Sequence, residues 1–185
     1  EQDAGVARIL STSAACNSCG GNGPAATTTY DSNGFKDLVT DFEGNQTNYD
    51  YAATGLETKR VEGVGSAVER TIETTWDTTY RVPLTVTTKN AGGTMVTRVV
   101  NTYWNGLIKT RTEEDYSTHS EPSRTTTYTY FGESGGDPAA LYGVLKSVDG
   151  PRTDVSDVTT FDYSSTGELT QITNALGHET DITVH

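Results

Sequence analysis

The chain has 185 residues, a formal net charge of −12 and a pI near 4.5, and 33% of its residues are hydrophobic. That length is sufficient for one domain with a core, but the hydrophobic share is below the roughly 45–50% of an ordinary globular domain. The acidic balance argues against nucleic acid and anionic membranes as partners, because both attract basic patches. Thr, Gly and Tyr fill the deficit, and since Thr and Tyr favour strands, the composition indicates a thin β structure rather than a disordered chain.

No run approaches the ~18 apolar residues of a transmembrane helix, so we expect no membrane insertion. The sequence contains no signal peptide, and Glu1 follows no initiator Met, which suggests an arbitrary boundary or a processing site at residue 1. Val184-His185 interrupts a repeat unit, so we expect the chain to be a fragment of a longer protein.

Residues 1–25 are expected to form an irregular N-terminal segment with a Gly-rich loop around Cys16 and Cys19. A zinc knuckle would need further ligands, and the three histidines are distant and scattered. A redox motif would need to open a helix in a βαβ unit, which the sequence does not predict. The interpretations that remain are a small Cys16–Cys19 disulfide, which would imply an oxidising compartment, or two thiols without a role.

From residue 26 onward the sequence alternates between strand-forming runs and Gly or Asn turns, which predicts an all-β fold. Asn33-Gly34 and Asn105-Gly106 are the strongest hairpin signals, because both residues of each pair tolerate a positive φ. One short helical turn is expected over 138–141. The expected strands, about 14 in number, cover residues 6–10, 26–31, 35–41, 47–51, 56–62, 68–77, 83–89, 94–104, 107–114, 123–131, 144–148, 158–163, 168–173 and 181–184.

A repeat runs through this pattern, because one Tyr and two Gly residues recur at fixed offsets. A period near twenty residues indicates a repeat architecture in which each unit covers the hydrophobic face of the last. Between residues 66 and 150 the frame is lost, so we expect insertions or irregular hairpins there. The residues that define the repeat are Tyr30, Asp31, Gly34, Gly44, Tyr49 and Tyr51, then Gly55 and Gly65, and finally Tyr163, Gly167 and Gly177.

Three motifs identify the repeat more closely: Tyr-Asp-x-x-Gly from Tyr30, Trp-Asp-x-x-Tyr-Arg from Trp76, and Asn-Ala-Leu-Gly-His from Asn174. On these motifs the chain from about residue 26 to 185 resembles the Rhs/YD-repeat family, which comprises bacterial polymorphic-toxin shells and relatives in ABC toxin complexes and teneurins. The resemblance implies stacked antiparallel hairpins in a curved, spiralling sheet, as a section of an Rhs-type β-shell over residues 26–185.

The same resemblance implies a non-catalytic structural role in a shell that encloses a toxin or other cargo. The expected partners are the remainder of a longer chain and the enclosed toxin domain, and the expected location is secreted or on the cell surface, after export by a bacterial secretion system. Asp137-Pro138 departs from the family's self-cleavage signature, since Ala139-Ala140 follows it, so no cleavage is assigned.

An alternative is a cell-surface YD-repeat module that recognises carbohydrate or a protein partner. Rows of tyrosines would serve that function, although aromatic residues on neighbouring strands more often stabilise a sheet. The tyrosines concerned are Tyr49, Tyr51, Tyr128, Tyr130 and Tyr163.

Candidate chemistry is sparse. Ser134 lies in a Gly-Glu-Ser-Gly-Gly run like that of trypsin-like proteases, but the only upstream His, His119, lies in a polar loop and lacks their context. The acidic residues Asp149, Asp154 and Asp157 have the spacing of no calcium loop. We therefore expect no catalytic residue, no cofactor and no metal site, and a protein that is not an enzyme.

Overall fold

The computed structural model describes residues 2–3, 6–7, 9, 11–13, 25–118 and 121–183. The chain divides into two compact units, Glu1–Arg98 and Val99–His185, and the boundary falls within one strand. The strands of the first unit are β1 (Gln2–Asp3), β2 (Val6–Ala7), β3 (Ser11–Ser13), β4 (Ala25–Tyr30), β5 (Lys36–Thr40), β6 (Gln46–Tyr51), β7 (Glu57–Glu62), β8 (Arg70–Asp77) and β9 (Val82–Asn90). Strand β10 (Met95–Trp104) contains the boundary, and the second unit continues with β11 (Leu107–Asp115), β12 (Arg124–Tyr130), the 3₁₀ turn η1 (Ala139–Leu141), β13 (Leu145–Asp149), β14 (Thr159–Tyr163), β15 (Leu169–Thr173) and β16 (Glu179–Asp181).

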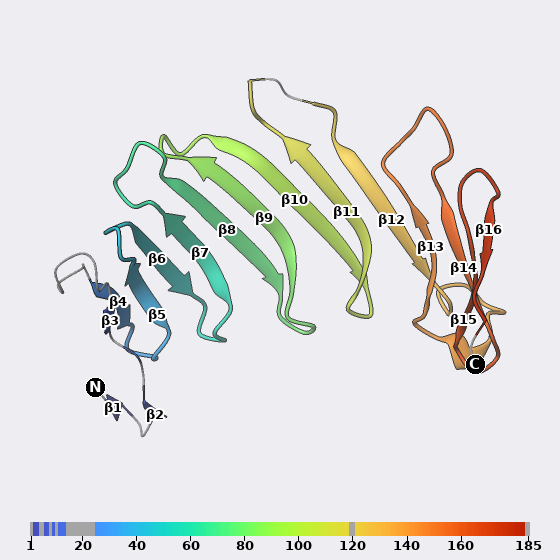
Figure 1. The fold of residues 1–185 in the computed structure, drawn as a ribbon, viewed down its shortest axis with the longest axis horizontal. Coiled ribbons are helices and arrows are strands. Elements are labelled where there is room, and N and C mark those ends of the chain that lie inside the picture. Colours follow the sequence, from blue (N-terminus) through green and yellow to red (C-terminus); the bar gives the residue numbers. More distant parts are fainter. Residues whose placement is uncertain are drawn as a thin grey trace, which may run out of the picture. The chain divides into compact units, whose positions relative to one another are not determined.

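The strand order of the main sheet follows the chain order. Strands β3 to β16 form a 14-stranded sheet in which each strand hydrogen-bonds to the next one along the chain, while β1 and β2 form a separate pair. Within the first unit, β4 to β9 lie side by side in that order (Figure 1). Every pair with a described register is antiparallel. The predicted all-β fold of stacked antiparallel hairpins is therefore confirmed.

Few side chains are buried, because no second layer of described elements covers the strands within either unit. Among the described residues, only Leu56, Tyr130 and Leu141 are buried hydrophobic side chains, at 8%, 7% and 4% exposure. Most strand residues are half-buried. Hydrophobic contacts in this fold therefore form chiefly between neighbouring strands and turns rather than between layers.

Most strands lie where the sequence predicts them, with ends that differ by one or two residues. The expected helical turn over 138–141 is confirmed as η1. The expected strand over 68–77 begins later than expected, because β8 starts only at Arg70 and Val68 is 83% exposed. Backbone hydrogen bonds from Ser66 to Gly63 and from Glu69 to Ser66 extend the loop and delay the strand. The expected strand over 181–184 is wrong, because the structure has β16 over Glu179–Asp181 and Val184 lies outside the described residues.

Candidate functional site

Six hairpin turns share one five-residue frame, and the first of them shows its geometry. The Asp31 N–H donates to the Phe35 carbonyl at 2.8 Å, and the Gly34 N–H donates to the Asp31 carbonyl at 2.9 Å. Gly34 has a φ of +83°, in the left-handed region that favours glycine. This arrangement fits a three-residue hairpin loop in which a turn is followed by a glycine bulge. The other five frames begin at Asp41, Ala52, Asn90, Ser164 and Asn174.

The first residue of the frame also stabilises the turn through its side chain. Asp31 Oδ1 accepts hydrogen bonds from the N–H groups of Asn33 and Phe35 at 2.9 and 2.8 Å. Asp41, Asn90, Ser164 and Asn174 accept the equivalent pairs, whereas Ala52 has no side-chain acceptor. The Asp of the Tyr-Asp motif is thus an acceptor for two backbone amides that would otherwise face solvent.

The two Asn-Gly pairs turn the chain in different ways. At Asn105-Gly106 both residues have positive φ, 50° and 82°, as a tight two-residue hairpin requires. At Asn33-Gly34 the expected hairpin is present, but only Gly34 has positive φ and the turn extends from Asp31 to Phe35. The Asp31 carboxylate stabilises the longer frame, since it accepts the N–H groups of Asn33 and Phe35.

The glycines of the predicted repeat all have positive φ, but they serve two kinds of loop. Gly65, at +73°, does not belong to the shared frame; its N–H donates to Glu69 Oε2 at 2.6 Å. The glycines that occupy the fourth position of the frame are Gly34, Gly44, Gly55, Gly93, Gly167 and Gly177.

An aromatic residue lies at the last or next-to-last position of the strand before alternate turns, and the register shifts next to it. The shift displaces the aromatic ring from the regular alternation of the strand. It occurs in five hairpins, and the aromatic residues concerned are Tyr30, Tyr51, Trp76, Tyr130 and Tyr163. This position includes the predicted Tyr30, Tyr51 and Tyr163, and also Trp76, the first residue of the Trp-Asp-x-x-Tyr-Arg motif.

Each of these aromatic side chains contacts an earlier part of the chain. Three of them donate to a backbone carbonyl: Tyr30 Oη to Ile9 at 3.1 Å, Trp76 Nε1 to Glu57 at 2.8 Å, and Tyr130 Oη to Ile108 at 2.8 Å. The other two make ring contacts, Tyr51 with Phe35 at 5.1 Å between centroids and Tyr163 with Phe131 at 6.0 Å. Each of these residues therefore joins its hairpin to an earlier part of the chain.

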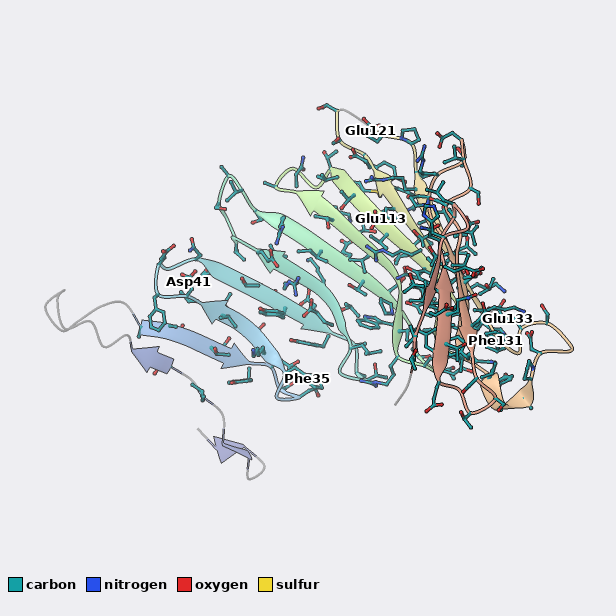
Figure 2. All side chains as sticks on the ribbon, turned by 45° about the vertical axis from the view of Figure 1, so that its right-hand side comes forward. Phe35, Asp41, Glu113, Glu121, Phe131 and Glu133 are labelled. Atoms are coloured by element: carbon teal, nitrogen blue, oxygen red, sulfur yellow. The ribbon has the colours of Figure 1, made fainter. Side chains whose placement is uncertain are left out.

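Phe35 and Asp41 flank β5, one just beyond each end, as Figure 2 shows, so each belongs to a different turn. The Phe35 ring also lies against the turn of the next hairpin: a Cβ built on Gly55 would lie 2.9 Å from its Cζ atom. Sequence reasoning missed Phe35, which follows the turn glycine and carries no periodic signal.

The two tyrosines proposed as a binding row pack against neighbours. The Tyr49 and Tyr51 rings are stacked at 6.4 Å, and both are half-buried. Tyr49 lies opposite Arg60 on β7, and burial, followed by the nearby Glu57 carboxylate, raises the pKa of Tyr51. These contacts are those expected of cross-strand packing in a sheet.

In the second unit the two sheet faces differ in chemistry. Paired registers place Tyr128 opposite Val148 and Phe161 opposite Ile172 on one face, and all four side chains are half-buried. The other face carries hydroxyl groups in register across six strands, several of which bond to one another. These residues are Thr102, Thr110, Thr112, Thr125, Thr127, Thr129, Ser147, Thr160 and Thr173.

The residues weighed for chemistry are not assembled into a site in the described part of the chain. Ser134 lies in an exposed loop, and His119 falls outside the described residues. Arg152 pairs with Asp154 at 2.8 Å, which lowers the pKa of that carboxyl, and the Arg152 N–H donates to Asp157. No group of three His, Cys, Asp or Glu side chains suited to a metal ion occurs among the residues described.

Two further expectations concern cysteines and membranes. Cys16 and Cys19 lie outside the described residues, so their disulfide stays a prediction. None of the described segments forms a helix long and apolar enough to cross a membrane.

No protein-family model and no curated protein matches the sequence. Among solved structures, the chain is similar to one of TcdB2-TccC3-Cdc42, with a TM-score of 0.48 and 16% identity over 86% of this chain and 10% of that chain. A structure of TcdB2-TccC3 gives a TM-score of 0.44 and 15% identity over the same shares, so this chain spans a tenth of the length of both. A porin-like protein from Bacteroides uniformis gives a TM-score of 0.47 and 16% identity over 85% of this chain and 73% of that chain.

Proposed function

We propose that the chain is a non-catalytic segment of an Rhs-type wall, in which stacked YD hairpins curve into part of a shell around a toxin or other cargo. The observation that carries the proposal is the backward contact of each repeat aromatic, as in the bond from Trp76 to Glu57. Such contacts use the aromatic residues of the motifs to join hairpins. Repeats of this kind build extended structures from nearest-neighbour contacts.

The thin sheet is consistent with a wall. An ordinary domain buries one face of a sheet against a second layer, whereas each unit here keeps most side chains of both faces half-exposed. The described candidates for catalysis and metal binding are dispersed, which supports a structural role over an enzymatic one. On this proposal the partners are further repeats of the parent chain and its cargo, and the protein acts outside the cell that makes it, in competition between bacteria.

The test has a genetic and a biochemical part. We expect the natural reading frame to encode further Tyr-Asp repeats on either side of this chain and a toxin-like domain beyond them. In the purified parent protein, that domain should resist protease until a hairpin is disrupted, for which Gly55→Val is suited because it adds bulk against Phe35. Absence of flanking repeats, or equal cleavage of the downstream domain in both proteins, would exclude the shell.

The alternative, a surface module that recognises carbohydrate, predicts a different result. This chain alone should then bind immobilised glycans, and Tyr49→Ala with Tyr51→Ala should abolish that binding without unfolding the protein. The stacked, half-buried state of both rings favours packing instead, so we expect the double variant to lose stability and the wild type to bind no glycan.

A further inference from the structure

The longest loop in the second unit is closed at its base by the backbone. The Phe131 N–H donates to the Val144 carbonyl at 2.9 Å, and the Gly143 N–H donates to the Phe131 carbonyl at 2.8 Å. We call residues 131–144 the strap. A segment closed in this way can move as one body, because its two ends are already held together.

The strap lies against the best-buried apolar cluster of its unit, with its own Tyr142 at the edge and 60% exposed. Its Leu141 side chain is 4% exposed, and Tyr130, at the end of β12, is 7% exposed. Tyr142 of the strap lies 5.2 Å from the Trp104 ring, and Asn105 Nδ2 donates to the Tyr142 hydroxyl at 2.9 Å. Trp104 in turn stacks on Tyr130 at 6.2 Å. Opening the strap would therefore remove the Tyr142 ring from Trp104, which stacks on Tyr130.

Two ion pairs hold the strap to the strands. Glu133 accepts from Lys109 of β11 at 2.7 Å, and Asp137 accepts from Lys146 of β13 at 2.9 Å. The carboxylates are 11% and 12% exposed, whereas the lysines are 43% and 44% exposed. Figure 2 shows Glu133 close to Phe131, and the Lys146 ammonium group lies 5.0 Å from the centre of the Phe131 ring.

The two pairs differ in how completely they are satisfied. Asp137 also accepts the Gly132 N–H at 2.9 Å, and these bonds, that with Lys146 first, lower its pKa. Glu133 Oε1 is buried and has no hydrogen-bond partner among the described residues. A buried carboxylate oxygen without a hydrogen-bond partner is unfavourable, so the free energy of the closed strap is higher than it would be with that oxygen bonded.

The strap also has a part with no packing. A Cβ added to Gly135 or Gly136 would meet nothing within 4 Å, and Ser134 is exposed. The strap thus has three parts: an unpacked tip at residues 134–136, two ion-paired carboxylates, and an apolar side with Leu141 and Tyr142. Regions that open locally have few buried contacts and solvent-exposed backbone.

We propose that the strap is a releasable cover, fastened by the Glu133–Lys109 and Asp137–Lys146 pairs, which opens as a unit and uncovers the Trp104 and Tyr130 rings while the sheet stays intact. Each pair joins a largely buried carboxylate to a half-exposed lysine, and because the lysines stay in contact with solvent, salt weakens both pairs. The device concerns the second unit alone and does not depend on what the wall encloses.

The test is amide hydrogen exchange, read segment by segment, on the wild type and on Glu133→Gln, Asp137→Asn and the double variant. Each single change should accelerate exchange of the strap amides about threefold to tenfold, as expected for the loss of one modest ion pair, and the double change more. Exchange in β11, β12 and β13 should be unchanged. Asp154→Asn is the matched control, since it breaks an ion pair with 59% and 68% exposed partners elsewhere in the unit and should leave the strap amides unaffected.

A second readout detects the uncovered rings. The hydrophobic dye anilinonaphthalene sulfonate should bind the double variant more than the wild type, while the far-ultraviolet circular dichroism of the two stays equal. Unchanged strap exchange in both single variants overturns the proposal, and so does acceleration that extends equally to β11–β13, because that result means loss of stability in the whole unit. If the double variant fails to fold, the single variants and a salt series on the wild type decide, since added salt should accelerate exchange in the strap alone.

Discussion

Phe35 and Gly55 are in contact across two hairpins, with so little space that a Cβ on Gly55 would lie 2.9 Å from the Phe35 ring. Gly55 also has a φ of +77°, so any other residue there meets two separate penalties. Gly44 occupies the same position in the preceding turn, with a φ of +88°, and has nothing within 4 Å of an added Cβ. Substituting Gly44 therefore introduces backbone strain alone, whereas substituting Gly55 introduces both backbone strain and overlap with the Phe35 ring.

Gly44→Ala should lower the free energy of unfolding by about 1–2 kcal/mol, the cost of a left-handed conformation for an L-residue. Gly55→Ala should cost a further ~1–3 kcal/mol, because the Phe35 ring must move. Urea denaturation followed by circular dichroism measures both. Equal losses in the two variants would show that the ring yields freely and contributes little to joining the hairpins.

The side-chain acceptor at the start of each turn can be tested by loss and by gain. Asn174→Ala should lower the unfolding free energy by about 0.5–1.5 kcal/mol, since the Leu176 and His178 amides lose their acceptor. Ala52→Asn should raise it by a similar amount, because Ala52 is the one first residue of the shared frame without an acceptor. Ala52→Leu controls for side-chain size and should bring no gain, and a gain from Leu as large as from Asn would refute the acceptor role.

The hydroxyl of Tyr130 should be worth more than that of its neighbour Tyr128. Tyr130 is 7% exposed and donates to the Ile108 carbonyl, whereas Tyr128 is half-buried and donates to no described residue. Tyr130→Phe should cost about 0.5–1.5 kcal/mol of unfolding free energy, and Tyr128→Phe close to none. Chemical denaturation of the two variants provides the comparison, and similar costs at both positions would mean that the backward hydrogen bond does not stabilise the repeat.

Alkaline pH should unfold the protein through its tyrosines. Burial is the first cause that raises the pKa of Tyr51, Tyr103, Tyr130 and Tyr163 above the ordinary 10.0. A group whose pKa is raised by folding contributes stability that is complete below its unfolded pKa and is lost as the pH rises through its folded pKa. We therefore expect stability to fall above pH 10.0, with late ionisation of four of the ten tyrosines.

The measurement is the ultraviolet absorbance of phenolate, recorded with circular dichroism on the same samples. Delayed ionisation should coincide with the loss of β signal, and Tyr130→Phe should remove part of the delayed fraction. Ionisation of all tyrosines in one step near pH 10.0, with the β signal unchanged, would contradict the prediction.

The sequence was sufficient for the parts of the fold that depend on local chemistry. Alternating Thr and Tyr runs predicted strands such as β6 and β12, and Asn105-Gly106 predicted its tight turn correctly, because these depend on backbone preferences of adjacent residues. Asn33-Gly34 marked its hairpin correctly but not the length of the turn, in which Asp31, two residues earlier, accepts the turn amides. Dipeptide signals do not contain that information.

The contacts between different hairpins could not be predicted from the sequence, for a different reason. Phe35 meets Gly55, and Trp76 meets Glu57, across about twenty residues, and such pairs depend on where the register shifts next to an aromatic residue. A single sequence gives no measure of register within a sheet whose faces are both partly polar. The strap ion pairs likewise join residues 24 and 9 positions apart, and nothing periodic marks them.

The backward direction of the aromatic contacts gives the repeat a polarity of assembly. Each aromatic side chain contacts a group that precedes it in the chain. For Trp76 this group is the Glu57 carbonyl, and for Tyr51 it is the Phe35 ring. When a hairpin leaves the ribosome, the group that its aromatic residue contacts has already been synthesised. The growing chain can therefore become ordered from its N-terminal side. For the same reason, a gene can gain or lose whole hairpins after a given hairpin without changing the contacts that the earlier aromatic residues make.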